Sequence, residues 1–273
     1  MTPYDIITER IISMLEKGTA PWTKTWSVKR GMPRNLVSGK PYRGINVWLL
    51  HSAAYESPFW LTYKQATEAG GNIKKGEKSM PAVFWKLAEV ADEKTGEAVK
   101  VPLLRYYSVF NLAQVQGLKE PEASATTSTP AALIVSNMPK LPQVKTGMAS
   151  AFYDPNADTV GMPDFARFDS EADYYGTLFH ELAHATGHTS RLNRLTPASF
   201  GSETYSKEEL VAEMASAFLC AQAGLERHLE NSASYIAGWL KALKDDRKLI
   251  VNAAACAQKA SDYILDIKHE KSE

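Results

Sequence analysis

The sequence is poor in cysteine, in long apolar runs and in net charge, and each shortage excludes a class of protein. Two cysteines among 273 residues, Cys220 and Cys256, cannot form a disulfide framework, so we expect a protein of the reducing cytoplasm. The first 18 residues mix charged and apolar side chains at helical spacing, unlike the uninterrupted apolar core of a signal peptide. No later run approaches the length of a membrane span, and we therefore expect no membrane partner.

Charge is balanced over the whole chain but is divided unevenly along it. Residues 1–120 contain 17 Lys and Arg against 11 Asp and Glu, whereas residues 121–273 contain 14 against 20. Five of the six tryptophans also lie within the first 86 residues. A basic and aromatic region is typical of proteins that bind nucleic acid, so we expect the two parts of the chain to differ in function.

A stretch rich in Ser, Thr, Ala and Pro, "KEPEASATTSTPA" at residues 119–131, is typical of a flexible linker. It predicts an α+β protein of two domains. Residues 1–118 would form a small α+β domain, and residues 132–273 a mainly α domain with a short β-sheet.

Apolar spacing, turn formers and helix caps predict the elements of each domain. In the first domain we expect helices over residues 3–17 and 45–55 and a long β-hairpin within residues 80–115. In the second we expect a short hairpin around residues 154–158, helices over residues 171–186 and 206–223, and one or two helices over residues 232–267. Ser206 is the expected N-cap of its helix, because Glu209 three residues later completes a capping box.

Three of the six histidines fall in the segment "HELAHATGH" at residues 180–188. His180 and His184 are four residues apart, so on a helix both imidazoles project from one face and can reach one ion. Glu181 lies about 100° round the helix from His180. Its carboxylate would therefore stand beside the open position of a metal, where it can take a proton from water. The same short pattern also arises by chance on ordinary helices, so the interpretation depends on a third ligand.

The segment "SKEELVAEMASAF" offers that ligand, because Glu209 and Glu213 are four residues apart on one side of a helix. We assign Glu209 as the third ligand of one Zn²⁺ per chain, and Glu213 as the carboxylate that orients a ligand imidazole. The reverse assignment stays open, and so does an ordinary solvated acidic face. Two imidazoles and a carboxylate suit zinc.

His188 lies four residues beyond His184, and Gly187 is expected to end the helix before it. We therefore interpret His188 as a helix cap, a hydrogen-bond partner of a ligand or a substrate contact, and keep it only as an alternative ligand. Tyr153 and Tyr205 are weaker candidates as hydrogen-bond donors to an oxyanion.

In the basic part of the chain, tryptophans and tyrosine alternate with cations and turn-forming residues. Exposed rings on which bases stack, flanked by cations that follow the phosphates, hold single-stranded DNA without reading its sequence. Each stacked base is worth about 1–3 kcal/mol. The alternative is that the tryptophans belong to the core and the lysines are merely solvated. The candidate DNA-binding residues are Trp22, Lys24, Trp26, Lys29, Arg30, Arg34, Tyr42, Arg43, Lys74, Lys75 and Lys78.

Longer segments are more specific than these short patterns. They include "PWTKTW", "PYRGINVWLL", "FWLTYKQATEAGGNIKKGEKS", "YYSVFNLAQVQGL", "FHELAHATGHTSRLNR", "YSKEELVAEMASAFLC" and "YIAGWLKALKDDRKLI". With these segments the chain resembles, over nearly its whole length, the ArdC-type antirestriction proteins of conjugative plasmids. The resemblance implies a single-stranded-DNA-binding domain followed by a zincin-like metallopeptidase domain.

The resemblance also implies a function, in which the protein escorts single-stranded plasmid DNA into a recipient cell and blunts host restriction. The family's peptidase motif maps onto His180, Glu181, His184 and the "EELVAE" helix, and its usual spacing supports Glu209 before Glu213. A host restriction-system component or another protein is the expected substrate of an active site. Two alternatives stay open: a non-catalytic shield for single-stranded DNA that holds a structural zinc, and a repair peptidase that DNA stimulates.

Overall fold

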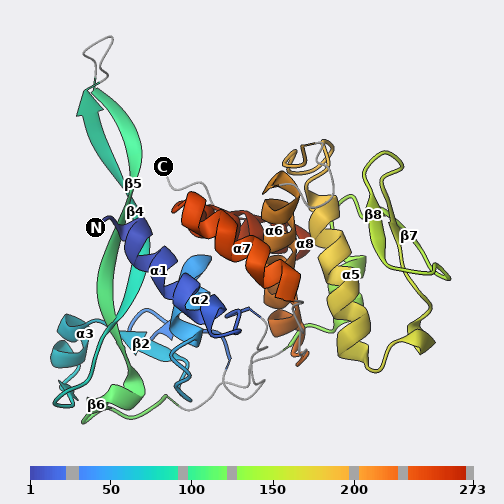
Figure 1. The fold of residues 1–273 in the computed structure, drawn as a ribbon. Helices are drawn as coiled ribbons and strands as arrows, with labels where there is room; N and C mark the ends of the chain where they lie inside the picture. The colour runs from blue at the N-terminus through green and yellow to red at the C-terminus, as the bar shows by residue number, and fades with distance from the viewer. Residues whose placement is uncertain (23–30, 92–97, 122–127, 197–202, 227–232, 269–273) are drawn as a thin grey trace. The chain divides into compact units, whose positions relative to one another are not determined.

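The computed structural model describes residues 1–22, 31–91, 98–121, 128–196, 203–226 and 233–268 (Figure 1). The fold is α+β, as the sequence predicts. The chain forms two compact units, Met1–Ile11 with Met32–Glu122, and Ile12–Gly31 with Ala123–Glu273. The segment Ile12–Gly31, assigned by sequence to the first domain, thus groups with the second unit. Of the predicted linker 119–131, residues 122–127 lie outside the described residues.

The first unit is built on a four-stranded sheet whose longest part is a hairpin (Figure 1). Its strands lie in the order β1 (Arg34–Asn35), β2 (Phe59–Leu61), β5 (Ala98–Asn111) and β4 (Met80–Ala91). β4 pairs antiparallel along its whole length with residues 98–109 of β5, which confirms the predicted hairpin. Two short strands, β3 (Asn72–Ile73) and β6 (Val115–Gln116), form a second sheet.

Short helices connect these strands: α2 (Ile45–His51), α3 (Tyr63–Glu68) and the 3₁₀ turn η1 (Leu112–Gln114). The helix α1 (Pro3–Glu16) precedes them. Thr62 caps α3 by accepting from the backbone N–H of Gln65, whose side chain bonds back to Thr62 in a complete capping box.

Asn46 of α2 covers part of the outer edge of β4. Its side chain accepts from the N–H of Val83 at 2.7 Å and donates to the carbonyl of the same residue at 2.8 Å. These two bonds satisfy backbone groups that an edge strand would otherwise leave open. The core beside this edge consists of Tyr42, Leu50, Trp60, Ala82 and Val109.

The second unit combines a three-stranded sheet with a group of long helices (Figure 1). In the sheet, β9 (Thr159–Gly161) lies between β7 (Gln143–Lys145) and β8 (Phe152–Asp154). β8 and β9 are antiparallel and form the predicted short hairpin. The other elements are α4 (Ala131–Ser136), η2 (Phe165–Arg167), α5 (Glu171–Thr186), α6 (Glu203–Ala223), α7 (Ala233–Asp245) and α8 (Leu249–Ile264).

The helix α5 has the bounds that its sequence predicts. Ser170 caps it by accepting from the N–H of Asp173 at 3.1 Å, and the helix ends at Thr186, one residue before Gly187. The predicted start of α6 is wrong, because this helix begins at Glu203 and already includes Ser206. The pair Ser206 and Glu209 has the spacing of a capping box but lies inside the helix, so it does not mark the helix start.

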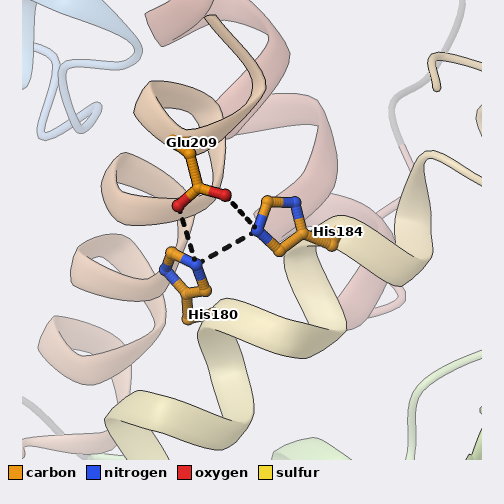
Figure 2. Close-up of side chains that lie close together, drawn as sticks. All are labelled: His180, His184 and Glu209. Atoms are coloured by element: carbon orange, nitrogen blue, oxygen red, sulfur yellow. Dashed lines mark hydrogen bonds and ion pairs between the residues drawn. The ribbon is translucent and has the colours of Figure 1, made fainter. Parts of the chain in front are cut away.

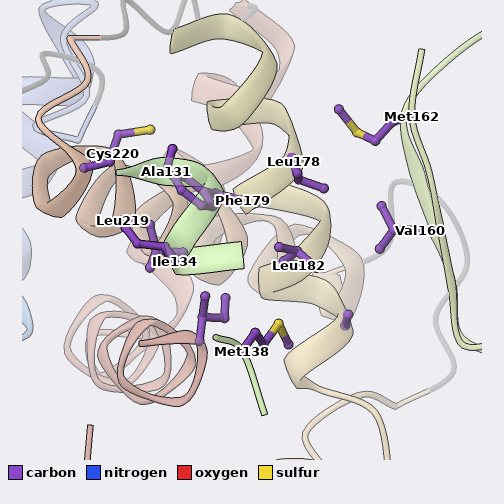
Figure 3. Close-up of a cluster of buried hydrophobic side chains, with 13 residues drawn as sticks. Ala131, Ile134, Met138, Val160, Met162, Leu178, Phe179, Leu182, Leu219 and Cys220 are labelled. Atoms are coloured by element: carbon purple, nitrogen blue, oxygen red, sulfur yellow. The ribbon is translucent and has the colours of Figure 1, made fainter. Parts of the chain in front are cut away.

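A buried apolar cluster joins α5, α6, α4 and the small sheet (Figure 3). Its fully buried members include Phe179 and Leu182 of α5, Leu219 of α6 and Val160 of β9. This cluster holds the polar face of α5 at a fixed distance from α6. No helix within the described residues is both long and apolar enough to cross a membrane.

We expect Leu182→Ala to lower the free energy of unfolding by about 2–5 kcal/mol, because it leaves a cavity in this cluster. Native-state hydrogen exchange of the α5 amides measures this loss. Leu133→Ala is the matched control, since Leu133 is 47% exposed on α4 and its truncation should change stability by about 0.5 kcal/mol or less. Equal losses in the two variants would contradict the assigned core.

Candidate metal centre

Two adjacent helices bring three potential metal ligands together in the second unit (Figure 2). His180 and His184 project from α5, one helical turn apart, and Glu209 faces them from α6. The Nε2 atoms of the two histidines are 3.1 Å apart. The Glu209 carboxylate lies 3.5 Å from Nε2 of His180 through one oxygen and 3.4 Å from Nε2 of His184 through the other.

These separations fit the edges of a tetrahedron around one small cation. Zinc binds His nitrogen and carboxylate oxygen at about 2.0–2.1 Å, so ligand atoms around a tetrahedral ion are roughly 3.3–3.4 Å apart. The two imidazoles and the carboxylate, whose two oxygens each approach one nitrogen, could thus supply three ligands of a tetrahedral site and leave one position for water or substrate. Lone pairs that converge this closely repel one another unless a proton or a metal ion lies between them.

The electrostatics of the pocket favour a cation. Burial of the His184 ring lowers its pKa, but hydrogen bonds and charges from Glu208 and Glu209 outweigh burial and raise the pKa to about 10. For Glu209, burial raises the pKa, and the bonds from His180 and His184 outweigh this and hold the pKa well below its usual range. The same negative potential that attracts a proton attracts a divalent ion.

Glu213 lies on the far side of His180 from the ligand atoms. Its Oε1 is 3.7 Å from Nδ1 of His180, one turn of α6 beyond Glu209. The other oxygen, Oε2, is buried without a hydrogen-bond partner within the described residues. Glu209 thus approaches the Nε2 atoms of both histidines, whereas Glu213 lies on the Nδ1 side of His180.

His184 has its own orienting carboxylate, Glu208, which sequence reasoning missed. Its Oε1 lies 3.3 Å from Nδ1 of His184. Arg194 holds this carboxylate in a fork, with Nη2 donating to Oε1 at 2.6 Å and Nε donating to Oε2 at 2.9 Å. Because both Glu208 oxygens are engaged, the carboxylate has one orientation, and it fixes the ring that presents Nε2 to the site.

The loop after α5 carries Arg194 back to this position. Backbone N–H groups of Arg194 and Leu195 both donate to the carbonyl of Gly187. A Cβ at Gly187 would lie 2.6 Å from Cγ of Leu195 and 3.1 Å from the His184 carbonyl. The glycine therefore permits this close approach. Arg194 also donates to the carbonyl of Ala183 at 2.9 Å, which ties the loop to α5.

Glu181 is buried beside the site, with 8% of its surface exposed. Burial raises the pKa of its carboxyl, which the two histidines partly offset. A carboxylate whose pKa is raised is a stronger base than one in water, as proton transfer from water requires.

Tyr205 lies one turn before Glu209 on α6 and is hydrogen-bonded to its carboxylate. Burial, the charge of Glu209 and this bond raise the pKa of Tyr205, so its hydroxyl stays a donor. Tyr153 is engaged elsewhere, donating to Asp158 at 2.8 Å. His188 lies in the loop after α5 and is hydrogen-bonded through Nδ1 to Ser190 at 2.8 Å, apart from the three ligand candidates.

The candidate DNA-binding residues fall into three groups. Trp22 and Tyr42 are buried, and Trp22 packs edge-on against Trp239 with ring centroids 5.4 Å apart. A base stacks only on an exposed ring face, so the prediction that these two rings bind DNA is wrong in this structure. Arg34 is half-buried in β1, whereas the exposed cations are Arg43, Lys74, Lys75 and Lys78. The remaining candidates Lys24, Trp26, Lys29 and Arg30 lie outside the described residues.

Two family models match the chain. The model for the N-terminal domain of anti-restriction factor ArdC matches residues 1–110, and the model for a zincin-like metallopeptidase matches residues 138–256. The second match contains the HELAH segment and Glu209.

Solved structures agree with these matches. The metal-free crystal structure of the antirestriction protein ArdC from plasmid R388 has a TM-score of 0.81 and 40% identity, covering 97% of each chain. The Mn(II)-bound crystal structure of that protein has a TM-score of 0.79 and 38% identity, covering 97% of this chain and 98% of the other.

Curated relatives extend the comparison. Two DNA primases TraC of Escherichia coli are 38% and 34% identical over 98% of this chain, which spans only 27% and 20% of their lengths. Protein y4eC of Sinorhizobium fredii is 34% identical over 96% of this chain and 92% of its own length.

We expect Glu208→Gln to weaken binding of a divalent metal by about 10–100-fold, because the His184 ring loses its charged partner. Competition with a chromophoric chelator measures the metal dissociation constant. Glu171→Gln is the matched control, since Glu171 is exposed at the start of α5 and makes the same change of charge. An affinity within twofold of the unmodified protein would show that Glu208 does not position the ligand.

Proposed function

Since this chain belongs to the ArdC family of antirestriction proteins, we propose that it protects incoming plasmid DNA during conjugation. In this proposal the first domain binds single-stranded DNA without reading its sequence. The second domain carries a zinc metallopeptidase site whose substrate is a host restriction-system component or another protein on the DNA. The convergence of His180, His184 and Glu209 on one point carries the proposal.

His180 Nε2, His184 Nε2 and one oxygen of Glu209 would hold one Zn²⁺ per chain. The close approach of the Glu209 carboxylate to both Nε2 atoms supports a small cation, and two imidazoles with a carboxylate are a donor set that zinc prefers. The Mn(II)-bound crystal structure of the relative from plasmid R388 supports a divalent ion in this family.

A bound divalent ion supplies Lewis-acid chemistry, activating water and polarising a peptide carbonyl. Glu181 accepts the proton of the attacking water on its carboxylate and passes it to the amine that leaves. Glu208 and Glu213 keep the two imidazoles turned so that Nε2 faces the site. Tyr205 holds the Glu209 carboxylate in place.

The DNA-binding part of the proposal rests on the family and on charge. Residues 1–120 carry six more positive than negative charges, and Arg43, Lys75 and Lys78 present exposed cations on the first unit. Lys74 is exposed as well, but its ammonium group donates to the carbonyl of Ala113 at 2.7 Å. Lys75 and Lys78 are therefore the better phosphate contacts among the exposed lysines that the sequence singles out.

Two alternatives differ from this proposal in what the metal does. In a shield for single-stranded DNA, zinc would only hold α5 against α6. In a repair peptidase, single-stranded DNA would stimulate cleavage of proteins bound to it. The buried Glu181 with its raised pKa favours chemistry over a purely structural ion, because a structural site needs no base.

Glu181→Gln separates catalysis from a structural metal. We expect this variant to keep one zinc per chain and to lose protein cleavage by at least about a hundredfold, because the proton acceptor is gone. Metal analysis and cleavage of casein, with and without single-stranded DNA, provide the measurements, and His180→Ala is the control that should lose the metal. Full plasmid protection by Glu181→Gln with zinc bound would favour the shield.

For the DNA partner, we expect tighter binding to single-stranded than to duplex DNA and a marked salt dependence. A plot of the logarithm of the binding constant against the logarithm of the salt concentration has a negative slope. Each phosphate contact that is lost should make this slope less steep by about 0.7 for single strands. Fluorescence anisotropy of Lys75→Gln and Lys78→Gln between about 50 and about 200 mM salt measures this change. Equal binding to both DNA forms at moderate salt would argue against base stacking.

A further inference from the structure

The hairpin of β4 and β5 extends well beyond the core of the first unit (Figure 1). The core cluster reaches the hairpin at Ala82 and Val109. Farther along, several large apolar side chains of the hairpin are exposed. They are Phe84, Trp85, Leu87, Val99, Leu103 and Tyr106. Apolar groups gathered in this way on an exposed ribbon mark an interaction surface.

The strand register sorts these residues onto two faces. Phe84 is paired with Arg105, and Lys86 with Leu103, so these four side chains share one face. We call Phe84, Lys86, Leu103 and Arg105 the basic face. The next residue along β4, Trp85, lies on the opposite face.

The basic face joins an exposed ring to two cations. Phe84 is 42% exposed, and Lys86 and Arg105 are exposed on either side of it. No acidic residue shares this face along the described hairpin, since Glu89 is paired with Lys100 on the opposite face. The face is therefore positively charged and complementary to a polyanion.

A contact with a neighbouring tyrosine also restrains the orientation of the Phe84 ring. Its ring meets the ring of Tyr107 edge-on, with centroids 5.7 Å apart and an interplanar angle of 61°. This contact restrains the Phe84 ring, which stays 42% exposed, and so reduces the side-chain entropy lost when a base stacks on it.

We infer that single-stranded DNA lies along the basic face, with a base stacked on Phe84 and phosphates contacted by Arg105 and Lys86. This inference rests on the proposed DNA-binding function and gives it a location, which the buried Trp22 and Tyr42 do not provide. A second copy of this chain is a poorer occupant, because a twofold contact through this face would bring two positively charged surfaces together.

The two faces of the hairpin supply matched variants. Phe84→Ala and Trp85→Ala each remove a half-exposed ring, from the basic and the opposite face respectively. Lys86→Gln and Lys100→Gln each remove one positive charge in the same way. Anisotropy of a fluorescent oligothymidine with the full chain measures affinity and its salt slope, and circular dichroism checks folding.

We expect Phe84→Ala to weaken binding about tenfold and Lys86→Gln to lower the salt slope by about 0.7, while both opposite-face variants stay within twofold of the unmodified protein. Equal losses from Lys86→Gln and Lys100→Gln, or a loss only from Trp85→Ala, would overturn the assignment to the basic face. The assignment would also be overturned if the basic-face variants lost self-association, measured by sedimentation, while their DNA affinity stayed unchanged. If the unmodified protein does not bind single-stranded DNA, the proposed function fails, whereas unchanged binding by Phe84→Ala overturns only this location.

Discussion

The packing of α5 against α6 sets the distances on which the candidate metal centre depends, because the candidate ligand atoms come from both helices. His180 and His184 are fixed relative to each other by the pitch of one helix, but Glu209 reaches them only at one separation and rotation of α6. The buried cluster with Phe179, Leu182 and Leu219 maintains that separation. Ser216 adds a polar link, donating from α6 to the carbonyl of Gly176 on α5 at 2.7 Å. The packing of the core therefore also determines the geometry of the site.

This constraint explains what the sequence could predict in the second unit. Helix α5 carries explicit signals at both ends, a serine cap and a glycine, so its bounds and the common face of His180 and His184 follow from spacing alone. The start of α6 could not be predicted in this way. Glu209 follows Ser206 at the spacing of a capping box, but its side chain faces His180 of α5. The sequence pattern of a capping box was therefore present without its structure. Glu208 and Arg194 were missed because their roles depend on how a loop folds back.

In the N-terminal part of the sequence, composition indicated aromatic and basic character but not which rings are exposed. Trp22 is buried because it packs against Trp239, a residue far along the chain, and no local pattern distinguishes that fate from a stacking surface. The hairpin was predictable from its β-branched and aromatic runs. Its faces were not, because a pairing shift of one residue exchanges them, and only the register places Phe84 beside Arg105.

Three of the four glutamates of α6 lie around the candidate metal centre. Glu209 faces the ligand position, while its neighbour Glu208 and the later Glu213 each stand behind one imidazole. One helix therefore supplies both the third candidate ligand and the carboxylates beside the first two. An adjacent pair of glutamates followed four residues later by a third is a pattern that can be sought downstream of other HExxH segments. Chains that keep only the ligand glutamate would have to align their histidines by other contacts.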